Sequence, residues 1–96
     1  MKAYCIVYVT IENETVFSEY RSQVIPTIEA CGGRFLVRGG AFTVLEGEMP
    51  FTRIAVLEFA SRKMAEDWYR SPAYQRILPL RTQAGKFQFI VADGVG

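Results

Sequence analysis

The amino-acid sequence predicts an α+β fold in which a four-stranded antiparallel sheet carries its helices on one face. Four stretches are rich in Val, Ile, Phe and Tyr, the residues that favour strands. The stretches between them have apolar residues three or four positions apart, which is the period of a helix. The order along the chain is β-α-β-β-α-β, the ferredoxin-like arrangement. Because 96 residues allow one such unit, we expect a single domain over residues 1–96.

The strands are expected over residues 3–10, 34–46, 53–59 and 86–92. The first strand is apolar on both faces, which indicates that both of its faces are covered. The second contains Gly39-Gly40, and two glycines inside an extended run mark a bulge or a tight bend.

The first helix is expected over residues 13–31. Asn13 is a plausible N-cap, and Gly32-Gly33 supplies a left-handed stop. Pro26 removes one backbone donor inside this stretch, so we expect a kink or break near Val24.

A Ser-Pro pair divides the second helical stretch. Ser61 is expected to cap a helix that runs to about Arg70. Ser71-Pro72 then supplies a new N-cap followed by proline at the first helical position. A short helix over residues 72–78 follows, and we expect Pro79 to end it.

Side-chain alternation gives the two faces of the sheet different chemistry. The purely apolar set is expected to meet the helices: Val7, Val9, Phe35, Val37, Leu57, Phe59, Phe87 and Phe89. The opposite face is mixed: Tyr4, Ile6, Tyr8, Arg34, Leu36, Arg38, Ile54, Val56, Glu58, Gln88 and Ile90. An open face with so many large apolar groups predicts an interface. We therefore expect a homodimer joined sheet to sheet as an α+β barrel, and stability only in that form, because so short a chain buries a thin core.

Composition excludes several classes of function. Eleven basic and ten acidic residues are mixed along the chain, and without a basic stripe we expect no nucleic-acid partner. The first apolar run is too short for a membrane span, so we expect a cytoplasmic protein with no membrane partner. The chain has no histidine, which removes His-based acid–base catalysis and His-ligated haem. Cys5 and Cys31 lack metal-binding spacing and are interpreted as buried thiols, so we expect no metal and no cofactor.

Four segments are distinctive enough to compare with known families: Gly32-Gly33-Arg34-Phe35, Val44-Leu45-Glu46-Gly47, 53–59 (RIAVLEF) and 68–74 (WYRSPAY). Together with Tyr20 and Arg81 they resemble a bacterial domain-of-unknown-function family of the dimeric ferredoxin-like α+β-barrel superfamily. The segment 49–52 departs from that family, which usually has a more polar or tryptophan-containing loop there. The resemblance implies a homodimer with sheets packed face to face and no agreed activity. Its wider relatives include cofactor-independent monooxygenases, lactone isomerases and haem-handling enzymes, a likeness of fold that does not give function.

Glu46 and Arg53 form the first candidate pair. If their strands pair as a hairpin, the two side chains lie close enough for an ion pair. Two interpretations stay open: a salt bridge that fixes strand register, or an anion-binding pair at the rim of a pocket.

Glu58 is the candidate catalytic residue. Apolar neighbours on its face would desolvate the carboxylate and raise its pKa unless a cation is near, and a raised pKa suits a general base. The alternative is an ion pair with Arg34 or Arg38. Tyr74 is expected to point its hydroxyl toward Tyr20, since tyrosines at a pocket wall can hold a small aromatic ligand.

These residues predict a small-molecule pocket between sheet and helices, with the candidates Tyr8, Tyr20, Arg38, Glu46, Arg53, Glu58 and Tyr74. The protein would be a small-molecule-binding homodimer. If it is an enzyme, it would be cofactor-independent, with Glu58 or a tyrosine transferring a proton, or with an electron-rich substrate oxygenated. The alternative is a non-catalytic dimer that binds a metabolite or a protein, with structural ion pairs and a filled pocket.

Overall fold

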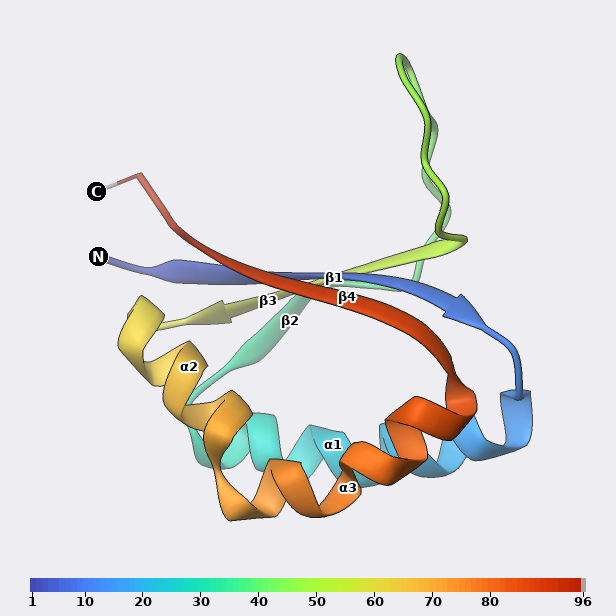
Figure 1. The fold of residues 1–96 in the computed structure, drawn as a ribbon. Coiled ribbons are helices and arrows are strands. Elements are labelled where there is room, and N and C mark those ends of the chain that lie inside the picture. The colour runs from blue at the N-terminus through green and yellow to red at the C-terminus, as the bar shows by residue number, and fades with distance from the viewer. Residues whose placement is uncertain (96) are drawn as a thin grey trace.

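The computed structural model describes residues 1–95. Its elements are β1 (Ala3–Ile11), α1 (Glu14–Ala30), β2 (Arg34–Arg38), β3 (Arg53–Phe59), α2 (Arg62–Arg70), α3 (Pro72–Ala84) and β4 (Gly85–Asp93). The strands form one antiparallel sheet in the order β2-β3-β1-β4. Figure 1 shows the helices on one face of this sheet. The predicted ferredoxin-like α+β fold is confirmed.

The core lies between the sheet and the helices. Cys5, Val7 and Val9 of β1 are at most 5% exposed, and the helices cover them with large side chains such as Trp68 and Tyr74. Of the apolar set predicted to face the helices, every member except Val37 is buried or packs against this core. Apart from Val37, the side chains of the sheet that face the helices were thus predicted correctly from the alternation.

The helix termini follow from local polar groups. Asn13, Ser61 and Ser71 each accept a hydrogen bond from the backbone N–H three residues later, which confirms the three predicted N-caps. Gly32, at a φ of 74°, follows the last turn of α1 in the left-handed conformation, as predicted.

Both internal prolines are accommodated without ending a helix. The predicted break near Val24 does not occur, because α1 continues through Pro26. The predicted end at Pro79 is wrong, because α3 continues to Ala84. Each proline is exposed, so the backbone bond it removes lies on the solvent side of its helix. In α3 the inward face also continues beyond the proline, with Arg81 half-buried and Ala84 buried.

A bulge in β2 reverses its side-chain alternation. Counting from Phe35 would place Val37 opposite Ala55, but Val37 pairs with Val56 and Arg38 pairs with Ala55. One extra residue is therefore inserted, which moves the following side chains to the other face. Val37 lies on the open face and Arg38 on the helix side, so the faces predicted for these two residues are wrong.

Residues 39–52 form an arm between β2 and β3, where the sequence predicted strand as far as Glu46. Gly39 begins the arm at a φ of 71°, a conformation that glycine adopts at little cost and that turns the chain out of the sheet. Figure 1 shows the arm, in green, rising from the sheet on the side away from the helices.

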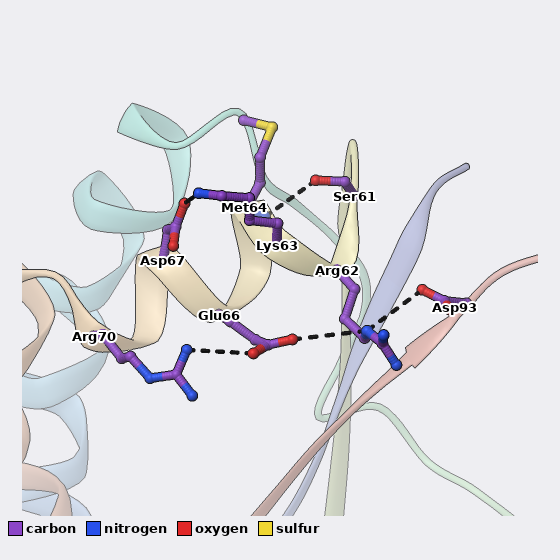
Figure 2. A network of polar contacts seen from close by, with 8 residues as sticks. All are labelled: Ser61, Arg62, Lys63, Met64, Glu66, Asp67, Arg70 and Asp93. Atoms are coloured by element: carbon purple, nitrogen blue, oxygen red, sulfur yellow. Dashed lines mark hydrogen bonds and ion pairs between the residues drawn. The ribbon is translucent and has the colours of Figure 1, made fainter.

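Exposed ion pairs connect α2 to β4 (Figure 2). Glu66 accepts from Arg70 at 3.3 Å and lies 3.7 Å from Arg62, which also lies 3.8 Å from Asp93 at the end of β4. Surface pairs of this kind each contribute little to stability. Only the Arg62–Asp93 pair joins α2 to β4 among the three, and the buried Trp68 attaches α2 to the core.

Gly33 allows the chain entering β2 to pass close to the core, and Gly33→Ala is expected to destabilise the fold. An added Cβ would lie 2.6 Å from the Phe59 ring and 2.9 Å from the Ile28 side chain. Overpacking of this kind costs about 1–3 kcal/mol. Urea denaturation at one fixed protein concentration measures the loss. Gly40→Ala is the matched control, since its Cβ meets nothing within 4 Å. Equal stability of the two variants would contradict the close approach.

Candidate functional site

A cavity of about 90 Å³ lies between α1 and the sheet. Its walls are almost entirely apolar, and the aromatic rings of Phe17, Phe35 and Phe87 form part of them. Apart from the Trp68 indole, its polar side chains are Tyr20, Arg21, Arg38 and Arg53. No acidic residue lines it within the described part of the chain. The cavity therefore combines an apolar interior with positive charge.

Three arginines lie at the more exposed part of the cavity. The Arg38 guanidinium lies 4.9 Å from the centre of the Phe35 ring, a cation–π contact that orients it. Arg53 lies 5.9 Å from the Phe17 ring and pairs with Glu14 at 3.2 Å. Arg21 and Arg38 have no carboxylate within 4.0 Å among residues 1–95. Two of the three charges are thus uncompensated.

A buried hydrogen-bond chain begins at the cavity wall. The hydroxyls of Tyr20 and Tyr74 are 2.8 Å apart, which confirms the predicted contact between these two tyrosines. Arg81 donates from Nη1 to the Tyr74 hydroxyl at 3.1 Å. Its guanidinium is held 4.7 Å from the centre of the Phe89 ring. Tyr20 lines the cavity, while Tyr74 lies behind it and is fully buried.

Burial controls the protonation of these hydroxyls. Desolvation raises the pKa of Tyr20, and it also raises the pKa of Tyr74. Both groups are therefore neutral at physiological pH and are available as hydrogen-bond donors and acceptors rather than as bases.

Glu58 lies outside the cavity, on the open face of the sheet. Its carboxylate accepts from Arg34 Nε at 3.0 Å and lies 3.5 Å from Lys2 Nζ. The hydrogen bond from Arg34 lowers the pKa of Glu58, so the raised pKa expected without a nearby cation does not occur. The alternative ion pair with Arg34 is confirmed. Arg38 is not part of it, because the bulge turns that residue to the helix side.

Two other predicted residues are also separated from the cavity. Glu46 is exposed on the arm, and the predicted pair with Arg53 does not form because the strands do not extend that far. Tyr8 lies on the open face, where its ring centre is 5.8 Å from that of Phe51. Of the predicted set, the cavity brings together Tyr20, Arg38 and Arg53, with Tyr74 directly behind Tyr20.

Sequence reasoning missed Arg21 and Phe17. Phe17 belongs to the apolar face of α1, where core residues and cavity-wall residues share the same helical spacing in the sequence. Arg21 stands next to Tyr20 at the border of that face, where a long side chain can cover an apolar surface and keep its charge in water. The signal that could have identified Arg21 as a cavity residue is its position as a charged residue at the border of the inward face of the helix.

A second hollow, of about 380 Å³, lies along α2 and β4 and is lined in part by Arg81, Glu66 and Arg70. Glu66 and Arg70 already pair with each other at 3.3 Å. Arg81 donates to the Tyr74 hydroxyl and lies over the Phe89 ring, so its guanidinium is already engaged. This hollow therefore offers less to a charged ligand than the cavity beside α1.

The cysteines are free. Burial raises the pKa of the Cys5 thiol to about 12, so Cys5 remains an unreactive thiol at neutral pH. No group of three or more His, Cys, Asp or Glu side chains within residues 1–95 is arranged to hold a metal ion. None of the helices described is long and apolar enough to cross a membrane.

The Glu58 ion pairs predict a contribution to stability at neutral pH that is lost in acid. Because the folded-state pKa lies below the ordinary value of 4.5, the contribution is present above that value and disappears as the pH falls through the folded pKa. Glu58→Gln should therefore lose less unfolding free energy than the wild type between about pH 7 and about pH 3. Glu48→Gln, on the exposed arm, is the control and should behave as the wild type does. Equal acid sensitivity of all three proteins would contradict the assignment.

Several solved structures share this fold at low sequence identity. A protein of unknown function from Rhodopseudomonas palustris aligns with a TM-score of 0.78 and 16% identity, over 99% of this chain and 83% of that one. A dimeric ferredoxin-like protein of unknown function from Jannaschia sp. CCS1 aligns with a TM-score of 0.71 and 14% identity, over 98% of this chain and 100% of that one. The cofactor-independent oxygenase SnoaB from Streptomyces nogalater aligns with a TM-score of 0.64 and 7% identity, over 99% and 94%. At these identities the likeness establishes the fold alone.

The search of curated proteins found no match to this sequence. The model of one protein family, described as a domain of unknown function (DUF1330), matches residues 2–95. This span contains the whole sheet, all three helices and every residue of the cavity. The chain therefore belongs to the DUF1330 family.

Proposed function

We propose that this protein is a homodimer in which each subunit binds a small organic anion with an apolar body in the cavity beside α1. The observation that carries the proposal is the uncompensated charge of Arg21 and Arg38 at the mouth of an otherwise apolar cavity. An apolar ligand body would gain from leaving water, and an anionic group would pair with the arginines. Tyr20, Arg38 and Arg53, all candidates from the sequence, are retained as ligand contacts, and Arg21 is added.

Two features of the cavity limit the size and the charge of the ligand. A cavity of about 90 Å³ holds a short branched or cyclic hydrocarbon rather than a cofactor-sized molecule. A cationic ligand would meet three arginines and no acid on the walls, which is unfavourable in a partly desolvated site. The geometry therefore supports a short-chain or small cyclic carboxylate.

The homodimer is supported by the face of the sheet that the helices leave open. Val37 and Ile90 on this face are 42% and 44% exposed. The arm stands on the same side and carries Phe42, Val44 and Leu45, which are 40%, 48% and 93% exposed. Exposed apolar side chains on this face and on the arm beside it suit a second copy packed sheet to sheet. The Jannaschia protein of similar fold is described as dimeric.

Cofactor-independent oxygenation of the bound molecule is the second candidate, supported by the aromatic cavity and by the fold shared with the Streptomyces oxygenase. Proton transfer by Glu58 is less favoured, because that carboxylate lies on the open face and is held ionised by Arg34 and Lys2. Consumption of dissolved oxygen in the presence of a bound carboxylate would distinguish oxygenation from binding alone.

The charge preference of the cavity can be tested with 4-methylpentanoate and its neutral analogue 4-methylpentanamide. The acid should bind at least about tenfold more tightly, since hydrogen bonds to charged groups contribute about 1.5–3 kcal/mol. Arg38→Met should remove most of this preference. Chemical-shift titration by NMR measures both dissociation constants in the millimolar range.

Arg34→Met is the matched control for this titration, because Arg34 is the other arginine of β2 and lies away from the cavity. It should retain the wild-type preference for the acid. Equal binding of the acid and the amide to the wild type would overturn the proposal.

The sheet-to-sheet dimer predicts that Ile90→Asp abolishes dimerisation and, because the fold is expected to be stable only as a dimer, destabilises the chain. Ile90 pairs with Ile6 in the middle of the open face, so a carboxylate there would be desolvated in a dimer but hydrated in a monomer. Sedimentation velocity reports the mass, and circular dichroism reports the fold. Met64→Asp, an exposed apolar position on α2, is the control and should remain dimeric. A wild-type chain that sediments as a monomer at micromolar concentration would contradict the dimer.

A further inference from the structure

The hydrogen-bond chain Arg81–Tyr74–Tyr20 has a direction. A guanidinium can only donate, so the Tyr74 oxygen is the acceptor of the bond from Arg81. The 2.8 Å contact between the two hydroxyls can then take either of two forms, because either oxygen can be the donor. The choice between these forms decides where the last free hydrogen of the chain lies.

Burial favours donation from Tyr74 to Tyr20. Tyr74 is 0% exposed, and no acceptor other than Tyr20 lies within hydrogen-bond distance of its hydroxyl among residues 1–95. If Tyr20 were the donor, the Tyr74 hydrogen would be left unbonded in the core, at a cost comparable to desolvating a polar group. The positive charge of Arg81 also polarises Tyr74 as a donor, because consecutive hydrogen bonds reinforce one another.

In this direction the hydrogen of the Tyr20 hydroxyl has no partner within residues 1–95, and Tyr20 is one of the residues that line the cavity. Tyr20 is 5% exposed and lines the cavity, whereas Arg21 and Arg38 are exposed. Tyr20 therefore belongs to the buried part of the lining and the two arginines to its open part. Figure 1 shows that α1, which carries Tyr20, and α3, which carries Tyr74 and Arg81, lie side by side beneath the sheet.

We infer that the ligand carries a hydrogen-bond acceptor, such as a keto or enolate oxygen, at the end opposite its anionic group, and that Tyr20 donates to it. This inference rests on the proposed function and specifies the class of ligand: a small oxo acid rather than a simple alkyl acid. Arg81 is a positioning residue, which acts through Tyr74 and does not touch the ligand.

Two pairs of probes that differ at one atom position test the inference. In 4-oxopentanoate and 5-oxohexanoate a keto oxygen replaces the branching methyl group of 4-methylpentanoate and 5-methylhexanoate. The readout is the ratio of dissociation constants within a pair, measured by chemical-shift titration. Tyr20→Phe should reduce the relative affinity for the better-binding oxo acid about threefold to tenfold, the usual net contribution of one hydrogen bond. The alkyl acids should be affected little.

The positioning role of Arg81 is tested with two substitutions at that position. Arg81→Met should lower the oxo-to-alkyl ratio, because Tyr74 would then be free to accept from Tyr20, while Arg81→Lys should restore it by donating again. Loss of stability alone would weaken both members of a pair equally and leave the ratio unchanged. These two variants also keep the inference testable if Tyr20→Phe fails to fold.

The possible failures are distinguishable. If none of the four acids binds to the wild type, the proposed function is overturned and the inference with it. If the alkyl acids bind but the ratio does not change in Tyr20→Phe or in Arg81→Met, the anion site stands and the donor role of Tyr20 is overturned. A ratio that falls in both variants and recovers in Arg81→Lys is the expected result.

Discussion

The position of β1 between β3 and β4 determines most of what this molecule presents to its surroundings. Since side chains alternate along a strand, Cys5, Val7 and Val9 enter the core, and Ile6 and Tyr8 are directed to the other side. Helices are available for only one of these faces. The other face therefore retains apolar side chains together with the Glu58 ion pairs, and the arm rises beside it.

The charged side chains of the cavity lie at the edges of the apolar layer between the helices and the sheet, not in its middle. Arginines enter from the edge of α1 and from β2 and β3, and aromatic rings fix two of their guanidinium groups. The tyrosine pair approaches from the interior, where burial keeps both hydroxyls neutral by raising their pKa. A single small space is thus charged at its opening and offers a neutral polar group inside.

The order of elements, the N-caps and the helix-facing set of the sheet could be predicted from the sequence, because each depends on neighbours within one turn or one strand. The contact of Tyr20 with Tyr74 was also predicted, since both lie on inward helical faces. The bulge before Val37 could not be predicted, because an inserted residue shows itself only in the pairing with β3. The predicted helix end at Pro79 was wrong because burial of residues beyond the proline outweighs the one backbone hydrogen bond that the proline removes. Residues such as Glu46 were misplaced because their strands were expected to extend further than they do.

Because of the bulge in β2, the charge of the cavity depends on the number of residues in that strand before Arg38. Arg38 reaches the helix side only because one extra residue precedes it, so losing a single residue there would carry the guanidinium to the opposite face while the composition stayed nearly unchanged. Among related chains, a one-residue insertion or deletion in this strand would change the charge of the cavity more than many substitutions would. Length variation at a sheet edge is therefore a way to alter the charge of this cavity without substituting any of its arginines.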